Sequence, residues 1–135
     1  MGRLEEEPKI TTKQFRNGSD YDQYLRNRGI HPYDGARAKG ILYTSGEMEV
    51  VIDTTFYQSG GIKPDQFGAL VAHELVELTT DDPQADLFAT IAEYQYILDA
   101  DGPNGLAQYH TNMGNLLGGV NADTRNTAYQ LLLKR

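Results

Sequence analysis

The segment His73-Glu74-Leu75-Val76-Glu77 contains the residue types and spacing of a small metal site. Residues four apart in an α-helix lie about 40° apart around its axis, so His73 and Glu77 would project from one strip and could bind a common cation. Glu74 falls between that strip and the apolar face of the helix, where a partly buried carboxylate is costly without a partner. Such a carboxylate suits a general base beside a metal-bound water. The segment therefore indicates metal-assisted chemistry.

The amino-acid composition limits the ligands that such a site could use. The 135-residue chain contains no cysteine, which excludes disulfides, thiolate zinc sites and cysteine nucleophiles. Any metal must therefore be held by His, Asp, Glu or backbone oxygen. The N-terminal residues lack the apolar stretch of a secretory signal, and no run approaches the roughly 20 apolar residues of a membrane span. We therefore expect a cytoplasmic protein with no membrane partner.

Acidic residues are concentrated in the second half of the chain. The formal net charge is -7, and residues 64–124 contain ten carboxylates and no Lys or Arg. Nucleic-acid binding needs a footprint of Lys and Arg, so this distribution argues against a nucleic-acid partner. Negative potential concentrated in this way attracts a metal ion or a basic protein partner. The ten carboxylates are Asp65, Glu74, Glu77, Asp81, Asp82, Asp86, Glu93, Asp99, Asp101 and Asp123.

The segment from Val71 to Leu78 resembles the metal-binding helix of the zincin metallopeptidases, in which the two histidines of an H-E-x-x-H motif flank a glutamate. His73 and Glu74 match the first histidine and the glutamate, which the resemblance makes a metal ligand and the general base. Glu77 stands where the family has its second histidine. In the gluzincin branch a glutamate from a following helix is the third ligand, and Glu93 is the corresponding candidate in this chain.

The resemblance leaves the third ligand open and also implies where a substrate would lie. His110, from a later helix, is the alternative to Glu93 and would restore a second imidazole, although a structural histidine is the competing interpretation. The strand from Met48 to Asp53 would be the edge strand that pairs with an extended peptide. Helical periodicity places Glu93 on one strip with Asp86 and Thr90, opposite an apolar stripe, which predicts that Glu93 is exposed.

The replacement of one histidine by a glutamate changes the ion and the reactivity that we expect. A divalent ion bound by His73, Glu77 and Glu93 has a formal site charge of zero instead of +1. Its bound water would be less acidic than in ordinary zinc hydrolases, so hydrolysis would be slower or the ion different. Zinc is the expected ion, and the oxygen-rich ligand set also favours manganese or iron(II).

Turn and capping signals predict the elements that position these residues. Two β-branched runs on either side of Ser45-Gly46 predict a β-hairpin. Pro64 and Pro83 each open a helix, and Gly102-Pro103 ends the second one. The order of a hairpin followed by helices indicates an α+β fold, with a small antiparallel sheet packed against about four helices. The expected elements are a short helix from Ser19 or Asp20 to about Gly29, strands at 40–44 and 47–53, and helices at 64–79, 82–100, 106–117 and from Asn121 or Asp123 onward.

The sequence supports two functional hypotheses. Residues 1–18 are interpreted as a polar arm that contributes little core, and residues 19–135 as a single zincin-like domain. The first hypothesis is a metal-dependent hydrolase of the metallopeptidase type that acts on a peptide or protein, with Glu74 as the base. The alternative is a non-catalytic zincin-like domain that binds a basic protein partner through the acidic residues 64–124. A carboxylate metal site inside a helical bundle is a third arrangement, but the paired Glu-x-x-His motifs of such sites are missing.

Overall fold

The computed structural model describes residues 9–32 and 36–134, and this part of the chain has an α+β fold. The described residues form one three-stranded sheet and five α-helices, with one turn of 3-10 helix, η1, before α3. The elements in chain order are β1 (Ile10–Phe15), α1 (Gly18–Arg26), β2 (Ala38–Leu42), β3 (Met48–Asp53), α2 (Thr54–Ser59), η1 (Pro64–Gln66), α3 (Phe67–Thr79), α4 (Ala85–Leu117) and α5 (Ala122–Leu133). The predicted fold class and the predicted hairpin of β2 and β3 are confirmed.

The strand order of the sheet is β1-β3-β2, with β3 in the centre. β1 runs parallel to β3 and pairs Ile10 with Met48, whereas β2 runs antiparallel to β3 and pairs Ala38 with Ile52. The prediction that Met48–Asp53 is an edge strand is therefore wrong. This strand is almost continuously apolar and buried, as expected for a strand with a neighbour on each side. The edge strand beside α3 is β2.

The N-terminal residues take part in the sheet, which corrects the prediction of an arm up to residue 18. Residues 10–15 form β1, and residues 1–8 lie outside the described part of the chain. Five of the six side chains of β1 are exposed, so the strand contributes backbone hydrogen bonds and little apolar core. Its polar sequence contains no hydrophobic alternation from which a strand could be predicted.

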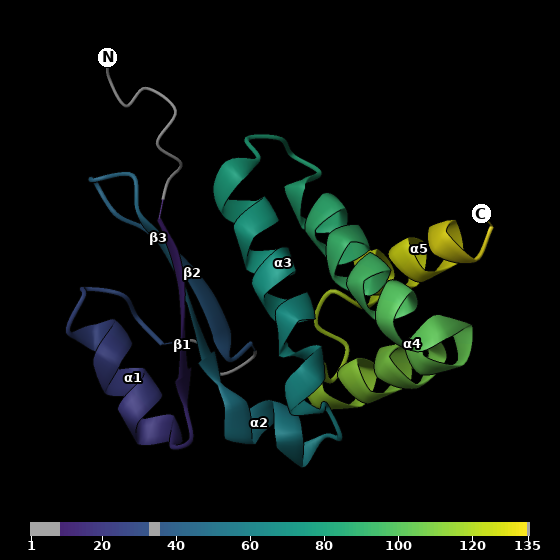
Figure 1. Cartoon of the computed structure of the whole chain (residues 1–135), viewed down its shortest axis with the longest axis horizontal. Helices are drawn as coiled ribbons and strands as arrows, with labels where there is room; N and C mark the ends of the chain where they lie inside the picture. The colour runs from purple at the N-terminus through teal and green to yellow at the C-terminus, as the bar shows by residue number, and fades with distance from the viewer. Residues whose placement is uncertain (1–8, 33–35, 135) are drawn as a thin grey trace.

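The sheet separates α1 from the other helices (Figure 1). On one face, Tyr21 and Leu25 of α1 pack against Ile41 and Val51. On the other face, Val50 belongs to the main core, which also contains residues of α3, α4 and α5. α3 therefore lies between the sheet and the α4–α5 pair, and its side chains can reach both.

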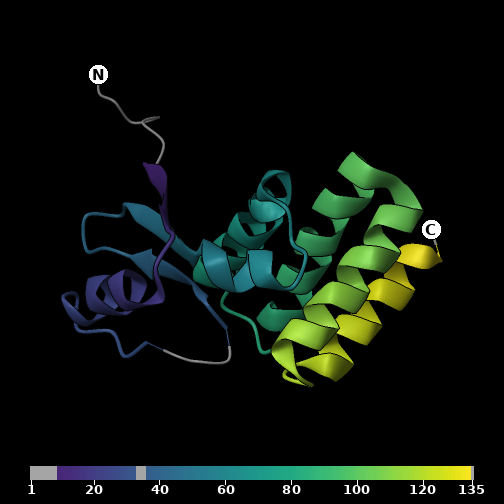
Figure 2. The same ribbon diagram turned by 90° about the horizontal axis from the view of Figure 1, so that it is seen from below.

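α4 consists of two helical segments that meet at Gly102. This glycine has φ 78° and ψ -178°, a backbone conformation that is essentially restricted to glycine. The two segments fold back on each other, and α5 packs beside them (Figure 2). The predicted break at Gly102-Pro103 is confirmed. Among the described residues no helix, α4 included, is both long and apolar enough to cross a membrane.

Candidate metal centre

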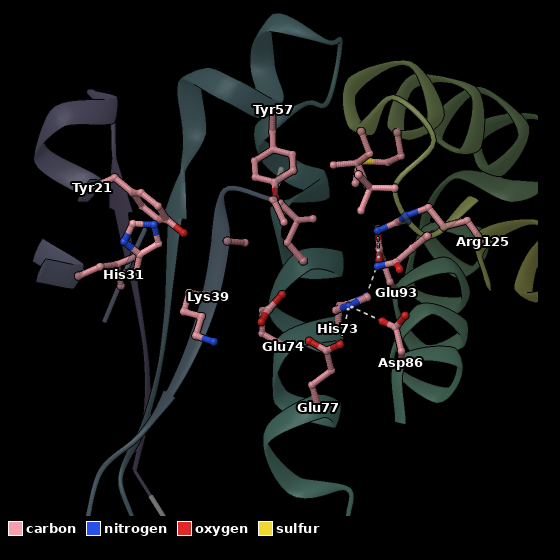
Figure 3. A pocket seen from close by; sticks show the side chains of 18 residues that line it. Tyr21, His31, Lys39, Tyr57, His73, Glu74, Glu77, Asp86, Glu93 and Arg125 are labelled. Atoms are coloured by element: carbon pink, nitrogen blue, oxygen red, sulfur yellow. Dashed lines mark hydrogen bonds and ion pairs between the residues drawn. The ribbon is translucent and has the colours of Figure 1, made fainter. Parts of the chain in front are cut away.

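α3 places His73 on the side that faces α4 (Figure 3). Phe67 and Leu70 of the same helix are buried, so His73 belongs to the side that packs into the core. The residue is only 8% exposed. Its two ring nitrogens point to different surroundings, because Nδ1 contacts the buried Glu93 and Nε2 lies near Glu77 and Asp86.

Glu93 is the most enclosed carboxylate of the site, with 0% exposure. Its Oε1 lies 2.8 Å from Nδ1 of His73, and its Oε2 accepts hydrogen bonds from the Tyr109 hydroxyl at 2.7 Å and from Arg125 at 3.1 Å. Burial alone would raise the pKa of Glu93, but the charge of Arg125 and the hydrogen bond from His73 bring it down to about 2. An ionised carboxylate can only accept, so Nδ1 of His73 carries a proton.

The other ring nitrogen of His73 faces two carboxylates. Nε2 lies 3.5 Å from Oε2 of Glu77 and 3.8 Å from Oδ1 of Asp86. The three atoms all lie within 4.8 Å of one another. A tetrahedral ion with bonds of about 2.1 Å separates its ligand atoms by about 3.4 Å, so small side-chain movements would bring these three atoms into coordination. The residues present therefore fit a divalent metal ion.

The structure changes the identity of the third candidate ligand. Glu93, one of the two predicted candidates, bonds Nδ1 and not the nitrogen that faces Glu77. His110, the other, lies between α4 and α5, where its Nδ1 is 2.6 Å from the Tyr94 hydroxyl and its Nε2 is 3.0 Å from Oδ1 of Asn126. The structural interpretation of His110 therefore fits its contacts. Asp86 is therefore the third candidate ligand beside His73 and Glu77, in place of both predicted residues.

Asp86 was missed although the sequence contained a signal for it. Asp86 and Glu93 are seven residues apart, which is two helical turns, so they project from the same strip of α4. That strip faces α3 and α5, which contribute His73 and Arg125. The prediction that Glu93 is exposed was wrong, because α3, the second segment of α4 and α5 cover this side of the helix with His73, Tyr109 and Arg125.

Several carboxylates surround one imidazole in this cluster, and they change one another's pKa values and that of the imidazole. Burial alone would lower the pKa of His73, but hydrogen bonds to Glu77 and Glu93 raise it to about 10. The hydrogen bond to His73 lowers the pKa of Glu77. Burial and the neighbouring Glu77 raise the pKa of Asp86. These shifts reflect the negative charge that is concentrated around the His73 ring.

Glu74 lies beside this cluster and is held by the sheet. Its Oε1 accepts a hydrogen bond of 3.1 Å from the backbone N–H of Gly40 in β2. The absence of a side chain at Gly40 permits this close approach, since a Cβ atom there would lie 2.9 Å from Leu78. Burial raises the pKa of Glu74 to about 7. The expectation that Glu74 is partly buried is confirmed.

A cavity of about 280 Å³ connects these groups. Glu74, Glu77 and Asp86 border it, together with Lys39 of β2 (Figure 3). Part of the remaining lining is apolar and comes from α3, the second segment of α4 and the loop before α5, and other lining residues come from α1, β2, α2 and α5. The apolar lining residues from α3, the second segment of α4 and the loop before α5 are Leu70, Met113, Leu117 and Val120. The cavity therefore offers room for a small group next to the candidate ligands.

Comparison with known proteins does not identify a family or a function for this chain. No protein-family model, no curated protein and no solved structure matches the chain.

Proposed function

We propose that the protein is a metal-dependent hydrolase of the metallopeptidase type, in which His73, Glu77 and Asp86 hold a divalent ion. The observation that supports this proposal most strongly is the convergence of three donor atoms from two helices within 4.8 Å of one another. When bound, the ion would supply a Lewis acid that polarises a substrate carbonyl and acidifies water.

The ligand set favours zinc, manganese or iron(II). With the ion bound, Nε2 of His73 would have lost its proton, and one neutral imidazole and two carboxylates would then give a formal site charge of zero. Nitrogen and carboxylate donors suit zinc, and two oxygen donors out of three also suit manganese or iron(II). Calcium is disfavoured, because it takes six to eight oxygen ligands.

Glu74 is the group that we assign as the general base. It borders the same cavity as the three ligands but is not one of them, so it can accept a proton without releasing the ion. Its hydrogen bond to Gly40 fixes the carboxylate at the edge of the sheet. A water in the cavity would therefore meet a base whose position is set by two elements, α3 and β2.

The edge of β2 that faces away from β3 suits an extended peptide as substrate. The N–H of Gly40 points away from β3, because it donates to Glu74. Backbone groups alternate along a strand, so those of Ala38 and Leu42 also point away from β3. Because the Gly40 N–H is already bonded to Glu74, a peptide that adds to this edge would bond the backbone groups of Ala38 and Leu42 and would pass the cavity that Glu74 borders.

The catalytic part of the proposal is tested by replacing Glu74 with Gln. A mixture of fluorogenic peptides is incubated with the protein and added Zn²⁺ or Mn²⁺, and turnover and metal content are measured together. We expect E74Q to retain the ion and to lose turnover by at least about 100-fold, as for a general base. Glu47→Gln, at the exposed hairpin turn, is the matched control and should behave like the wild type. Loss of metal and turnover together in E74Q would contradict the assignment of Glu74 as a base.

The exposed carboxylates favour a second candidate function, the binding of a basic protein. Seven of the ten carboxylates in residues 64–124 are exposed, and the sequence between them supplies no Lys or Arg. Such a surface would bind a basic peptide in a salt-dependent manner. Binding of a lysine-rich peptide would support this function if the affinity falls with added salt and does not change with added metal. The absence of binding at low salt would exclude it.

A further inference from the structure

We infer that Glu93 is a positioning residue for the proposed metal centre, since its carboxylate holds the His73 ring with Nε2 turned toward Glu77 and Asp86. This inference rests on the proposed function. It assigns Glu93 a different role from the one predicted for it, because its carboxylate acts on the metal through His73 and does not bind the metal itself.

Both oxygens of Glu93 are held by groups from other parts of the chain. Oε1 contacts Nδ1 of His73 at 2.8 Å and accepts from Arg125 at 3.3 Å. Oε2 accepts from the Tyr109 hydroxyl at 2.7 Å and from Arg125 at 3.1 Å. These partners belong to α3, the second segment of α4 and α5. The carboxylate therefore cannot rotate without breaking several hydrogen bonds.

The contact between Glu93 and His73 fixes the direction of the imidazole ring. A histidine side chain has two torsions, and the bond from Nδ1 to a fixed acceptor limits both. Nε2 then faces the partly exposed carboxylates of Glu77 and Asp86, whose side chains are 37% and 38% exposed. Metal-binding histidines almost always donate their second N–H to a carboxylate, a carbonyl or a water in this way.

A purely structural role for Glu93 would not require its contact with His73. Arg125 and Tyr109 alone would link the two segments of α4 to α5 and would compensate the buried charge. The additional contact to His73 brings in α3, the helix that carries Glu77. Removal of the carboxylate should therefore affect metal binding as well as stability, and the two effects can be measured separately.

Glu93→Gln is the principal variant, because it keeps the shape and removes the charge. The amide places two N–H donors on one side, where they face either the Nδ1–H of His73 or the donors of Arg125 and Tyr109. Donors that face each other repel, so the imidazole loses its fixed direction in the first orientation, and in the second the amide loses the hydrogen bonds that hold it in place. We expect the dissociation constant for Zn²⁺ or Mn²⁺, measured by calorimetry on folded protein, to rise about 10- to 100-fold.

Tyr109→Phe provides a second variant in case E93Q does not fold. It removes one hydrogen bond to Oε2 and keeps the ring, and we expect weaker metal binding in the same direction. Tyr24→Phe is the matched control, since the Tyr24 hydroxyl donates to Glu49 at 2.6 Å, a residue of β3 outside the cluster. It should leave the metal affinity unchanged.

Nuclear magnetic resonance of the His73 ring distinguishes a positioning role of Glu93 from a merely structural one, because it reports the exchange of the Nδ1 proton with water. The proton on Nδ1 should exchange slowly with water in the wild type and in Y24F, and faster in E93Q and Y109F.

The inference is supported if the Glu93 and Tyr109 variants show both faster exchange of the Nδ1 proton and weaker metal binding. It is overturned, with the proposed function intact, if the wild type binds metal and the folded variants bind it equally well. A wild type that binds neither ion overturns both.

Discussion

A single imidazole connects the interior of the protein to its surface. Nδ1 of His73 contacts Glu93, which is fully buried, whereas Nε2 faces carboxylates that are about one-third exposed. An ion could therefore enter from the solvent side without disturbing the core. The buried side depends on Arg125, whose two terminal nitrogens both bond Glu93. The energetic cost of enclosing the Glu93 carboxylate is offset at this contact.

Replacement of Arg125 by Met should therefore destabilise the protein strongly. The buried Glu93 charge would lose its only cationic partner apart from His73 among the described residues, and breaking a buried pair on one side costs about 3 to 5 kcal/mol. Arg26→Met, at an exposed position in α1, is the control and should change stability by less than about 0.5 kcal/mol. Urea unfolding measures both, and equal losses in the two variants would show that the Arg125–Glu93 pair is not essential to the core.

At the scale of elements, the break in α4 determines which side chains meet. The turn at Gly102 reverses the helix, so that Tyr109 of the second segment returns to Glu93 of the first. The loop before α5 then turns the chain again and brings Arg125 to the same carboxylate. The site therefore depends on the geometry of one glycine as well as on its own residues.

Gly102→Ala should lower stability by about 1 to 3 kcal/mol, because a Cβ atom disfavours the positive φ of this position. There is space for the added atom, since nothing lies within 4 Å of it, so the cost is backbone strain alone. Gly114→Ala is the matched control. It also has nothing within 4 Å and lies inside helical backbone, where alanine should stabilise by up to about 1 kcal/mol. Thermal unfolding that shifts the two variants in the same direction would contradict this explanation.

Local signals predicted the elements, and long-range contacts account for what could not be predicted. The proline at position 64 and the pair Gly102-Pro103 correctly marked a helix start and a helix break, because these residues restrict their own backbone. β1 carries no such signal, and its place beside β3 depends on pairing across more than thirty residues. The burial of Glu93 likewise depends on Arg125. Asp86 could have been inferred from its helical strip, which it shares with Glu93.

At the scale of the whole molecule, several tyrosines are enclosed as neutral groups. Tyr21, Tyr57, Tyr94 and Tyr109 are each at most 2% exposed. Burial raises the pKa of all four, and that of Tyr94 to about 12. A group with a raised pKa in the folded state contributes stability that is present below its unfolded pKa and is lost as the pH rises toward the folded value.

The free energy of unfolding should consequently fall steeply as the pH rises above about 10, where the tyrosines of the unfolded chain ionise. Tyr94→Phe removes one of these groups, so the fall between about pH 10 and pH 12 should be shallower in this variant, whatever its stability at neutral pH. Urea unfolding at a series of pH values gives the slope. An unchanged slope in Y94F would show that the Tyr94 hydroxyl ionises as easily in the folded protein as in the unfolded chain.

The proposed metal centre is tested most directly by metal content. The wild type, Asp86→Ala and the control Asp81→Ala, an exposed residue beyond the end of α3, are dialysed against Zn²⁺ or Mn²⁺ and then against buffer, and bound metal is measured by mass spectrometry. We expect about one ion per chain in the wild type and in D81A, and a large loss in D86A, because Asp86 supplies one of three donor atoms. A wild type that retains no metal, or a D86A variant that retains as much as the wild type, would contradict the proposed site.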